Sequence, residues 1–291
     1  MFTSDGGRVP VVYPRLRTLS MAHGELYSMK AMGLLPDVAF MPQLRRLRLG
    51  APPEVSLVAL LRGSWGTLES LEVNYTREAV GRMEELCAAF SNMPSNLRHI
   101  SMLEIFDYPS YEANTEEVAR CAFSMCPTIE SVTIAGASEP DENVWKYALD
   151  GLSLVNLTRL NAPWSTLDMT GVVTILRAAP NLQAIACRTV EVGGRFDKYD
   201  DAALPAHMHK NYYPLGKCFT EIDVWCTDSV SRDISRTALL LGVMCPVFTF
   251  LNVEREYVEK CRTMMQAKAS TSPYKAFQPM VDTICVRERK E

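Results

Sequence analysis

A short phrase of apolar residues recurs along the whole chain and limits its fold more strongly than any other feature. Three copies follow the pattern Pro-x-Leu-x-x-Leu-x-Leu most closely, at Tyr13–Met21, Met41–Leu49 and Ala179–Cys187. Weaker copies keep three apolar residues at the same spacing, and they are Leu68/Leu71/Val73, Leu97/Ile100/Met102, Ile129/Val132/Ile134, Leu157/Leu160/Ala162, Phe219/Ile222/Val224, Phe248/Leu251/Val253 and Val281/Ile284/Val286. Repeated units of this kind must stack on one another to bury a common core, so the phrase predicts a repeat protein.

The spacing of the copies identifies the type of repeat. We call the first apolar residue of each copy its lead residue. The lead residues run from Leu16 to Val281 at an average step of about 29 residues, which is the length of a leucine-rich repeat. The next two apolar residues alternate with other residues, as in a strand with one buried face, and the lead residue closes the turn before that strand. The ten copies therefore predict ten short strands that stack in parallel.

The intervals between the copies contain apolar residues three or four positions apart, which is the pattern of an amphipathic helix. The predicted helices are Glu25–Leu35, Ser56–Leu61, Arg77–Phe90, Thr115–Met125, Glu142–Leu154, Met169–Ala179, Ile234–Met244 and Arg255–Ala267, with a further short helix at Pro205–Tyr213. Together these elements predict an α/β leucine-rich-repeat solenoid of about ten repeats. Such a right-handed superhelix has a parallel sheet on its concave side and helices on its convex side.

Residues 1–291 are expected to form a single domain of this kind. Residues 1–12 are expected as an N-terminal extension, and residues 192–216 as a long insertion within one repeat. Long insertions lie on one face of a repeat array and often contact ligands, although an insertion can also be tolerated without a function. The alternative fold is a doubly wound sheet, which also alternates strands and helices but does not require the apolar phrase to recur at an even step.

Composition excludes several classes of partner as first choices. The chain has a net charge of -4, so it lacks the general positive field that draws proteins to nucleic acids or anionic membranes. Its most apolar run, Ala238–Phe248, is too short to span a bilayer. The nine cysteines are scattered and mostly lie in apolar runs, which is typical of reduced, buried thiols. We therefore expect a cytoplasmic or nuclear protein.

In these repeats the chain resembles the F-box/leucine-rich-repeat proteins and the ribonuclease-inhibitor-like superfamily, from about Tyr13 to the end. Asn211–Trp225, Ala238–Val253 and Ser272–Val286 are also similar to a group of uncharacterised fungal F-box-like proteins. The resemblance implies a substrate receptor of a ubiquitin ligase, in which the repeats hold the target and an F-box docks the ligase adaptor. No F-box is visible in this sequence, so the adaptor is expected as a partner only if an F-box lies outside this chain.

Signatures of catalysis are absent from the sequence. It contains no phosphate-binding G-x-x-x-x-G-K-[ST] pattern, no dinucleotide-binding G-x-G-x-x-G pattern, no G-x-S-x-G elbow and no H-E-x-x-H zinc pattern. We therefore expect no cofactor, no metal and no catalytic residue. The alternative is a hydrolase with its site in the concave groove, for which His99 and Glu72 on neighbouring predicted strands are the best pair.

The remaining prediction is a protein-binding surface. Side chains alternate across a strand, so the residues between the apolar ones point into the concave side of the sheet. Trp225 is the preferred anchor, since aromatic and arginine residues most often anchor protein interfaces. Alternatively, Trp225 and Phe250 pack on each other and only stabilise the sheet. The early strands are expected to be positive and the surroundings of Trp225 negative. The candidate partner-binding residues are Arg46, Arg48, Glu72, His99, Arg159, Glu221, Asp223, Trp225, Phe250 and Glu254.

Overall fold

A computed structural model of the 291-residue chain describes residues 11–21, 39–50, 66–75, 96–104, 115–124, 128–135, 144–193, 196, 198–225 and 231–289. The chain divides into two compact units. We call Met1–Ser110 with Glu117–Ile134 the N-terminal unit, and Tyr111–Glu116 with Ala135–Glu291 the C-terminal unit. A single domain over residues 1–291 remains a prediction.

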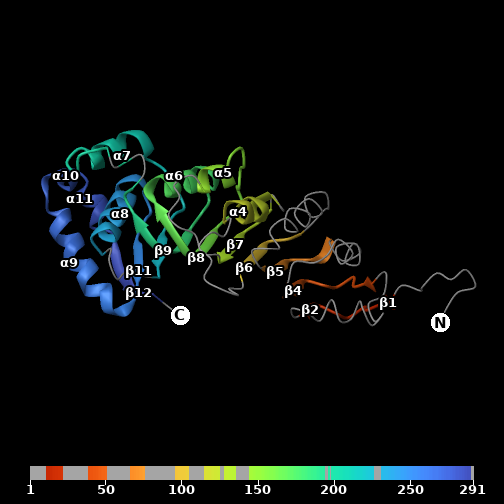
Figure 1. Cartoon of the computed structure of the whole chain (residues 1–291). Helices are drawn as coiled ribbons and strands as arrows, with labels where there is room; N and C mark the ends of the chain where they lie inside the picture. The colour runs from red at the N-terminus through yellow and green to blue at the C-terminus, as the bar shows by residue number, and fades with distance from the viewer. Residues whose placement is uncertain are drawn as a thin grey trace, which may run out of the picture. The chain divides into compact units, whose positions relative to one another are not determined.

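The chain has an α/β fold with an all-parallel sheet, which confirms the predicted class (Figure 1). Ten described strands lie in this sheet in the order β12-β11-β10-β9-β8-β7-β6-β5-β4-β2, so successive copies of the apolar phrase supply neighbouring strands. A second sheet pairs β1 (Val11–Val12) with β3 (Ala39–Phe40). The strands of the large sheet are β2 Thr18–Met21, β4 Arg46–Leu49, β5 Ser70–Tyr75, β6 His99–Glu104, β7 Ser131–Ala135, β8 Arg159–Asp168, β9 Ala184–Glu191, β10 Glu221–Val224, β11 Phe250–Val253 and β12 Cys285–Glu288.

Burial along the strands follows the predicted alternation. In β4, Arg46 and Arg48 are exposed, whereas Leu47 and Leu49 are buried. Most of the predicted lead residues are buried in the core of their unit, whereas Leu16 is partly exposed. Burying a leucine or phenylalanine side chain stabilises a fold by roughly 1.5–3 kcal/mol. The lead residues that are no more than 2% exposed are Leu44, Leu68, Leu97, Ile129, Leu157, Leu182, Phe219 and Phe248.

A backbone hydrogen-bond motif recurs between successive strands. The carbonyl oxygen of the residue after a lead residue accepts two consecutive N–H groups from the next copy. In the N-terminal unit the Arg17 oxygen lies 2.9 and 3.0 Å from the nitrogens of Arg45 and Arg46. In the C-terminal unit the Thr220 oxygen lies 2.9 Å from the nitrogens of both Thr249 and Phe250. A carbonyl oxygen has two lone pairs and can therefore accept both N–H groups. The same arrangement of hydrogen bonds thus satisfies these backbone groups in each turn. The same motif occurs at the carbonyl groups of Arg45, Glu69, Arg98, Thr158 and Gln183.

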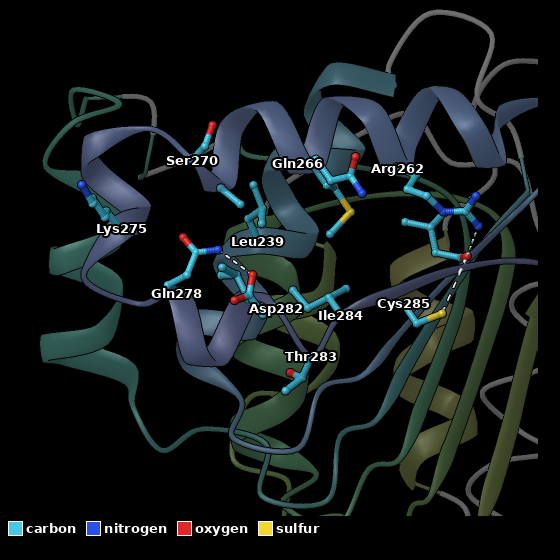
Figure 2. Close-up of a pocket in the computed structure, with 14 residues that line it drawn as sticks. Leu239, Arg262, Gln266, Ser270, Lys275, Gln278, Asp282, Thr283, Ile284 and Cys285 are labelled. Carbon is cyan, nitrogen blue, oxygen red and sulfur yellow. Dashed lines mark hydrogen bonds between the residues drawn. The ribbon is translucent and has the colours of Figure 1, made fainter.

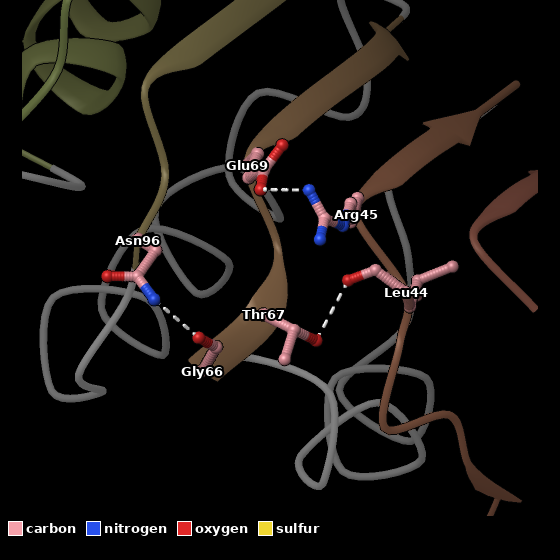
Figure 3. Close-up of polar contacts among 6 residues, drawn as sticks. All are labelled: Leu44, Arg45, Gly66, Thr67, Glu69 and Asn96. Atoms are coloured by element: carbon pink, nitrogen blue, oxygen red, sulfur yellow. Dashed lines mark hydrogen bonds and ion pairs between the residues drawn. The ribbon is translucent and has the colours of Figure 1, made fainter. Parts of the chain in front are cut away.

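Small polar side chains directly before the lead residues form a second set of links between copies. In the N-terminal unit, Thr67 Oγ1 donates to the Leu44 carbonyl at 2.9 Å, and Asn96 Nδ2 donates to a carbonyl of the preceding copy at 2.6 Å (Figure 3). Asn181 stands at the equivalent place in the C-terminal unit, and its Nδ2 donates in the same way at 2.7 Å. These side chains satisfy turn carbonyls that the strand ladder leaves without a backbone donor.

Helices lie between the strands much as the sequence predicts. Their bounds are α4 Thr115–Ser124, α5 Val144–Ala148, α6 Met169–Ala178, α7 Leu204–Tyr212, α8 Ser231–Met244, the 3₁₀ helix Arg255–Tyr257, α9 Val258–Ala269, α10 Ser272–Lys275 and α11 Gln278–Val281. None of the helices in the described ranges has both the length and the apolar character needed to cross a membrane. The predictions Thr115–Met125, Met169–Ala179, Ile234–Met244 and Arg255–Ala267 are confirmed within a few residues, whereas Glu25–Leu35, Ser56–Leu61 and Arg77–Phe90 lie outside the described residues.

The helix predicted at Glu142–Leu154 is shorter than expected, because α5 ends at Ala148. Gly151 follows with a φ of 70°. This left-handed conformation is open to glycine and commonly ends helices, since it turns the chain away from the helix axis. The glycine overrides the apolar periodicity on which the longer prediction rested.

The tenth copy of the apolar phrase is displaced by two residues from the prediction. Leu251 of β11 pairs with Val286 of β12. Val286 therefore takes the place that the prediction gave to Ile284. The predicted strand register was wrong here by one step of the strand period, and Ile284 makes the hydrogen bond to the carbonyl three residues earlier that Leu44 and Phe248 make as lead residues.

Packing of Ile284 explains this displacement. Its N–H donates to the Val281 carbonyl at 3.1 Å, in the turn before β12. Its side chain fills the space beside Gly242 of α8, where an added Cβ would lie 2.6 Å from Ile284 Cδ1. A shift of two residues keeps every side chain on its predicted face, because side chains alternate with a period of two. It also extends the polar face of the sheet to Arg289.

The insertion at residues 192–216 contributes to the core of the C-terminal unit. Phe196 is 1% exposed, and its ring lies edge-on to Tyr212 at a centroid distance of 5.8 Å. The short helix predicted at Pro205–Tyr213 is confirmed as α7, which buries Met208. Asp201 forms an ion pair with Arg236 of α8. These contacts give the insertion a packing role.

The described cysteines differ in oxidation state. The prediction of reduced thiols is confirmed at Cys187, Cys218, Cys245, Cys261 and Cys285, which are free. It is wrong at Cys121, which is bonded in a disulfide. Burial raises the pKa of the Cys187 and Cys245 thiols, because a thiolate is costly to place in an apolar core. These two residues are therefore unreactive core residues.

Candidate functional site

The polar face of the C-terminal sheet presents side chains in aligned rows. One row consists of Arg159, Ala184, Glu221, Phe250 and Cys285, and the next consists of Asn161, Ala186, Asp223, Asn252 and Arg287. Arg188, Trp225, Glu254 and Arg289 follow one step further along their strands. We call these residues the C-terminal face. The two alanines of β9 place no large side chain between Arg159 and the acidic residues of β10.

Trp225 and Phe250 are each covered by an arginine on or directly after β12. The Arg289 Cζ atom lies 3.8 Å from the Trp225 ring centroid, and the Arg287 Cζ atom lies 2.9 Å from the Phe250 ring centroid. A guanidinium placed over an aromatic ring is attracted by the negative face of the ring. Trp225 remains 40% exposed. The two rings make no contact with each other in the described structure, so the alternative in which they stack together is not formed.

Asp223 is a partly buried acidic group of the C-terminal face. Asn252 Nδ2 donates to Asp223 Oδ1 at 2.6 Å. Burial raises the pKa of the Asp223 carboxyl, and the nearby charge of Glu221 adds to the rise. The hydrogen bond from Asn252 and the positive charges of Arg289 and Arg159 act in the opposite direction. Asp223 is therefore held between two arginines, although no ion pair joins it to either of them in the described chain.

The candidate residues of the N-terminal unit lie on the polar face of its strands, where Arg46 and Arg48 are exposed. Arg48 Nε forms an ion pair with Glu72 Oε1 at 2.8 Å. His99 aligns with Ser70, two residues before Glu72 on β5, and it does not contact the Glu72 carboxylate. The pair chosen for a hydrolase site is thus not assembled, because the carboxylate of Glu72 is bound by Arg48.

Comparison with protein-family models and with curated proteins gives no match for this chain. Within the described residues, no three His, Cys, Asp or Glu side chains lie close enough together to hold a metal ion.

Sequence reasoning missed the contribution of β12 to this site. Arg287 lay on the predicted face but was not selected, and Arg289 lay beyond the predicted strand. Their charges offset those of Glu221, Asp223 and Glu254, which the sequence predicts around Trp225. The alternation Cys285-Val286-Arg287-Glu288-Arg289 was the available signal, since it places both arginines on one face if Val286 is taken as the buried residue.

Proposed function

We propose that the chain is a leucine-rich-repeat solenoid that binds another protein through the C-terminal face. The recurrence of one turn geometry at an average step of about 29 residues supports the repeat assignment. Parallel strands, buried lead residues and intervening helices are the features that such repeats require. The resemblance to F-box/leucine-rich-repeat proteins is consistent with this assignment.

The single observation that carries the binding proposal is the composition of the C-terminal face. Trp225 is half-exposed between Arg188 and Glu254 on the neighbouring strands, and it is held in place by Arg289. Tryptophan and arginine are enriched among the residues that dominate binding energy at protein interfaces. A guanidinium stacked on a ring uses its flat side and keeps its positive charge, although the Nη1 atom of Arg289 is buried and has no hydrogen-bond partner. The face therefore offers apolar area beside charged groups.

The resemblance to the F-box relatives extends this proposal to a role in ubiquitin ligation. The bound protein is then a substrate of a ubiquitin ligase, and the C-terminal face is the part that selects it. The ligase adaptor binds only if an F-box accompanies this chain. Coprecipitation of the adaptor with the product of the complete gene tests this extension separately from substrate binding.

The binding proposal is tested with the full chain as bait in a lysate, followed by affinity measurement for each purified partner. Trp225→Ala is expected to weaken binding by about 30-fold, because a central tryptophan contributes roughly 2 kcal/mol or more. Tyr147→Ala is the matched control, since Tyr147 is 53% exposed on helix α5 and lies outside the sheet. Partners that bind Trp225→Ala as tightly as the parent chain contradict the assignment of this face.

A further inference from the structure

The polar face of the N-terminal strands contains a row of side chains that can all donate hydrogen bonds. Thr18 of β2, Arg46 of β4, Ser70 of β5 and His99 of β6 are aligned in this order across four neighbouring strands. We call these four residues the donor row. Arg46 and His99 are exposed, and no side chain of the row has a hydrogen-bond or ion-pair partner in the described part of the chain. The donor row is therefore open to a molecule from outside.

Positive charge is in excess around the donor row. Three carboxylates of these strands and turns are each bound to an arginine of their own. The pairs are Arg48 with Glu72 at 2.8 Å, Arg45 with Glu69 at 3.0 Å and Arg98 with Glu130 at 3.2 Å. Arg46 and two exposed arginines of the turn before β2, Arg15 and Arg17, are left without a carboxylate in the described structure. The complement of this surplus charge is an anion.

The basic residues of a pocket in the C-terminal unit are arranged in the opposite way (Figure 2). This pocket of about 710 Å³ lies among α8, α9, α10, α11 and the start of β12. Arg262 is paired with Glu259, and the lining that contains Lys275 also contains the carboxylate of Asp282. Carboxylates thus accompany the positive charges of this pocket, whereas none accompanies Arg46.

Ser70 is the small residue between two longer side chains of the donor row. Neighbouring strands are about 4.8 Å apart, so the Cα atoms of Arg46 and His99 are about 10 Å apart, with Ser70 between them. Ser70 is partly buried, whereas its two neighbours in the row are exposed. A small group that rests on the Ser70 hydroxyl is therefore within reach of the guanidinium on one side and the imidazole on the other.

A phosphate monoester fits this arrangement better than a carboxylate does. Its three terminal oxygens are strong acceptors that point in different directions, and it carries nearly two negative charges at neutral pH. The donor row offers a guanidinium, a hydroxyl and an imidazole N–H group from three neighbouring strands. The guanidinium of arginine also matches the geometry of phosphate oxygens. A carboxylate has two oxygens in one plane and leaves one of these donors without an acceptor.

We propose that the donor row binds a phosphate monoester group. The phosphate lies over Ser70 and accepts hydrogen bonds from Ser70, Arg46 and His99, while Thr18 adds a second hydroxyl beside Arg46. All of these residues belong to the N-terminal unit, so the site is independent of protein binding on the C-terminal face.

Nuclear magnetic resonance titration of the full chain tests the proposal, with the ring signals of His99 as the readout and His99→Gln to assign them. Inorganic phosphate and O-phospho-L-serine are expected to shift these signals saturably at constant pH and ionic strength, with dissociation constants of about 1–10 mM. L-glutamate, which carries a carboxylate where O-phospho-L-serine carries its phosphate, is expected to bind about tenfold more weakly than O-phospho-L-serine. Equal affinity for the two phosphates supports free phosphate as the ligand, and tighter binding of O-phospho-L-serine supports a phosphate carried on a larger molecule.

Variants of the row test which residues hold the phosphate. Arg46→Gln is expected to weaken phosphate binding about tenfold, because it removes the charged donor, and Ser70→Ala about threefold. Arg120→Gln is the matched control, since Arg120 is exposed on α4 of the same unit and lies outside the sheet. Arg46 is exposed as well, so neither arginine substitution disturbs the core. The proposal is overturned if phosphate does not saturate, if L-glutamate binds as tightly as O-phospho-L-serine, or if Arg120→Gln weakens binding as much as Arg46→Gln.

Discussion

The two units use arginine differently on the polar faces of their strands. In the N-terminal unit, Arg48 of β4 is paired with Glu72 of β5 at 2.8 Å, and Arg45 is paired with Glu69 at 3.0 Å in the turns directly before these strands (Figure 3 shows the second pair). In the C-terminal unit, Arg289 lies over the Trp225 ring and has no carboxylate partner in the described structure. The comparison shows that one residue type can be either neutralised by a carboxylate or held against a ring without one.

This difference assigns separate roles to the two faces. A cross-strand ion pair uses the hydrogen-bonding edge of the guanidinium, so little of its binding capacity remains for another molecule. Stacking on a ring restrains the same side chain and lowers the entropy lost when a partner binds, but the buried Nη1 of Arg289 leaves only part of that edge for a partner. Recognition of a partner protein is therefore expected on the C-terminal face, with the ion-paired arginines of the N-terminal face contributing mainly solvation and register.

The cores of the units differ as well, and the largest expected effect tests this part of the comparison. Phe219 and Phe248 stack at a centroid distance of 5.6 Å in the C-terminal unit, whereas the lead residues of the N-terminal unit are aliphatic. Phe248→Ala is expected to lower the free energy of unfolding by about 3–5 kcal/mol, because it creates a cavity and removes the ring contact. Urea unfolding measures this change.

Leu44→Ala is the matched variant in the N-terminal unit, where Leu44 is 1% exposed. It is expected to lower the free energy of unfolding by at least about 1 kcal/mol less than Phe248→Ala, since no aromatic contact is lost. An equal or larger loss at Leu44 shows that the aromatic pair gives the C-terminal core no special strength.

Much of this fold could be predicted from the sequence because burial imposes a strict period. Leu47 and Leu49 of β4 had to share one face, so Arg46 and Arg48 had to share the other. The same reasoning placed Glu221 and Asp223 on the polar face of β10. Each of these assignments depends only on the sequence of one strand and on which of its two faces is buried.

The sequence-based predictions fail where two placements of a residue fit the local pattern equally well and a contact with a distant segment selects one of them. At the end of the chain, both Ile284 and Val286 are apolar residues suited to the buried face, and only the space beside Gly242 selects between them. The position of Arg289 over Trp225 spans the intervening strand β11, so no pattern within either segment predicts it. Periodicity identifies the face of a residue, whereas long-range packing determines its neighbour.

Double-mutant cycles compare the two uses of arginine directly and address the next largest effect. The cycle Arg289→Ala with Trp225→Ala is expected to give a coupling energy of about 1 kcal/mol, since the contact is partly shielded from water. The cycle Arg48→Ala with Glu72→Ala is expected to give about 0.2–1 kcal/mol, because the Arg48 side chain is largely exposed and water screens the pair. Chemical unfolding at low salt supplies both values.

Salt separates the two interactions further. The coupling between Arg48 and Glu72 is expected to fall as ionic strength rises, because exposed charges are screened over about 10 Å at 0.1 M salt. The coupling between Arg289 and Trp225 is expected to change less, since part of it comes from the packed ring. Equal salt dependence in the two cycles contradicts the distinction between the faces.

The smallest expected effect concerns Asp223, the acidic group that the C-terminal face encloses. Its pKa in the folded chain is raised above the ordinary value of 3.8, mainly by burial, so the folded state binds a proton more tightly than the unfolded state does. The contribution of this group to stability is therefore fully present below pH 3.8 and is lost as the pH rises through the folded pKa.

The variant Asp223→Asn keeps a side-chain oxygen that can accept the hydrogen bond from Asn252, but it removes the negative charge. The variant is expected to melt at a slightly higher temperature than the parent chain at neutral pH, and this difference is expected to shrink on acidification. A neutral-pH melting temperature below that of the parent chain contradicts this account, because it shows that the arginines around Asp223 stabilise its charge more than burial disfavours it.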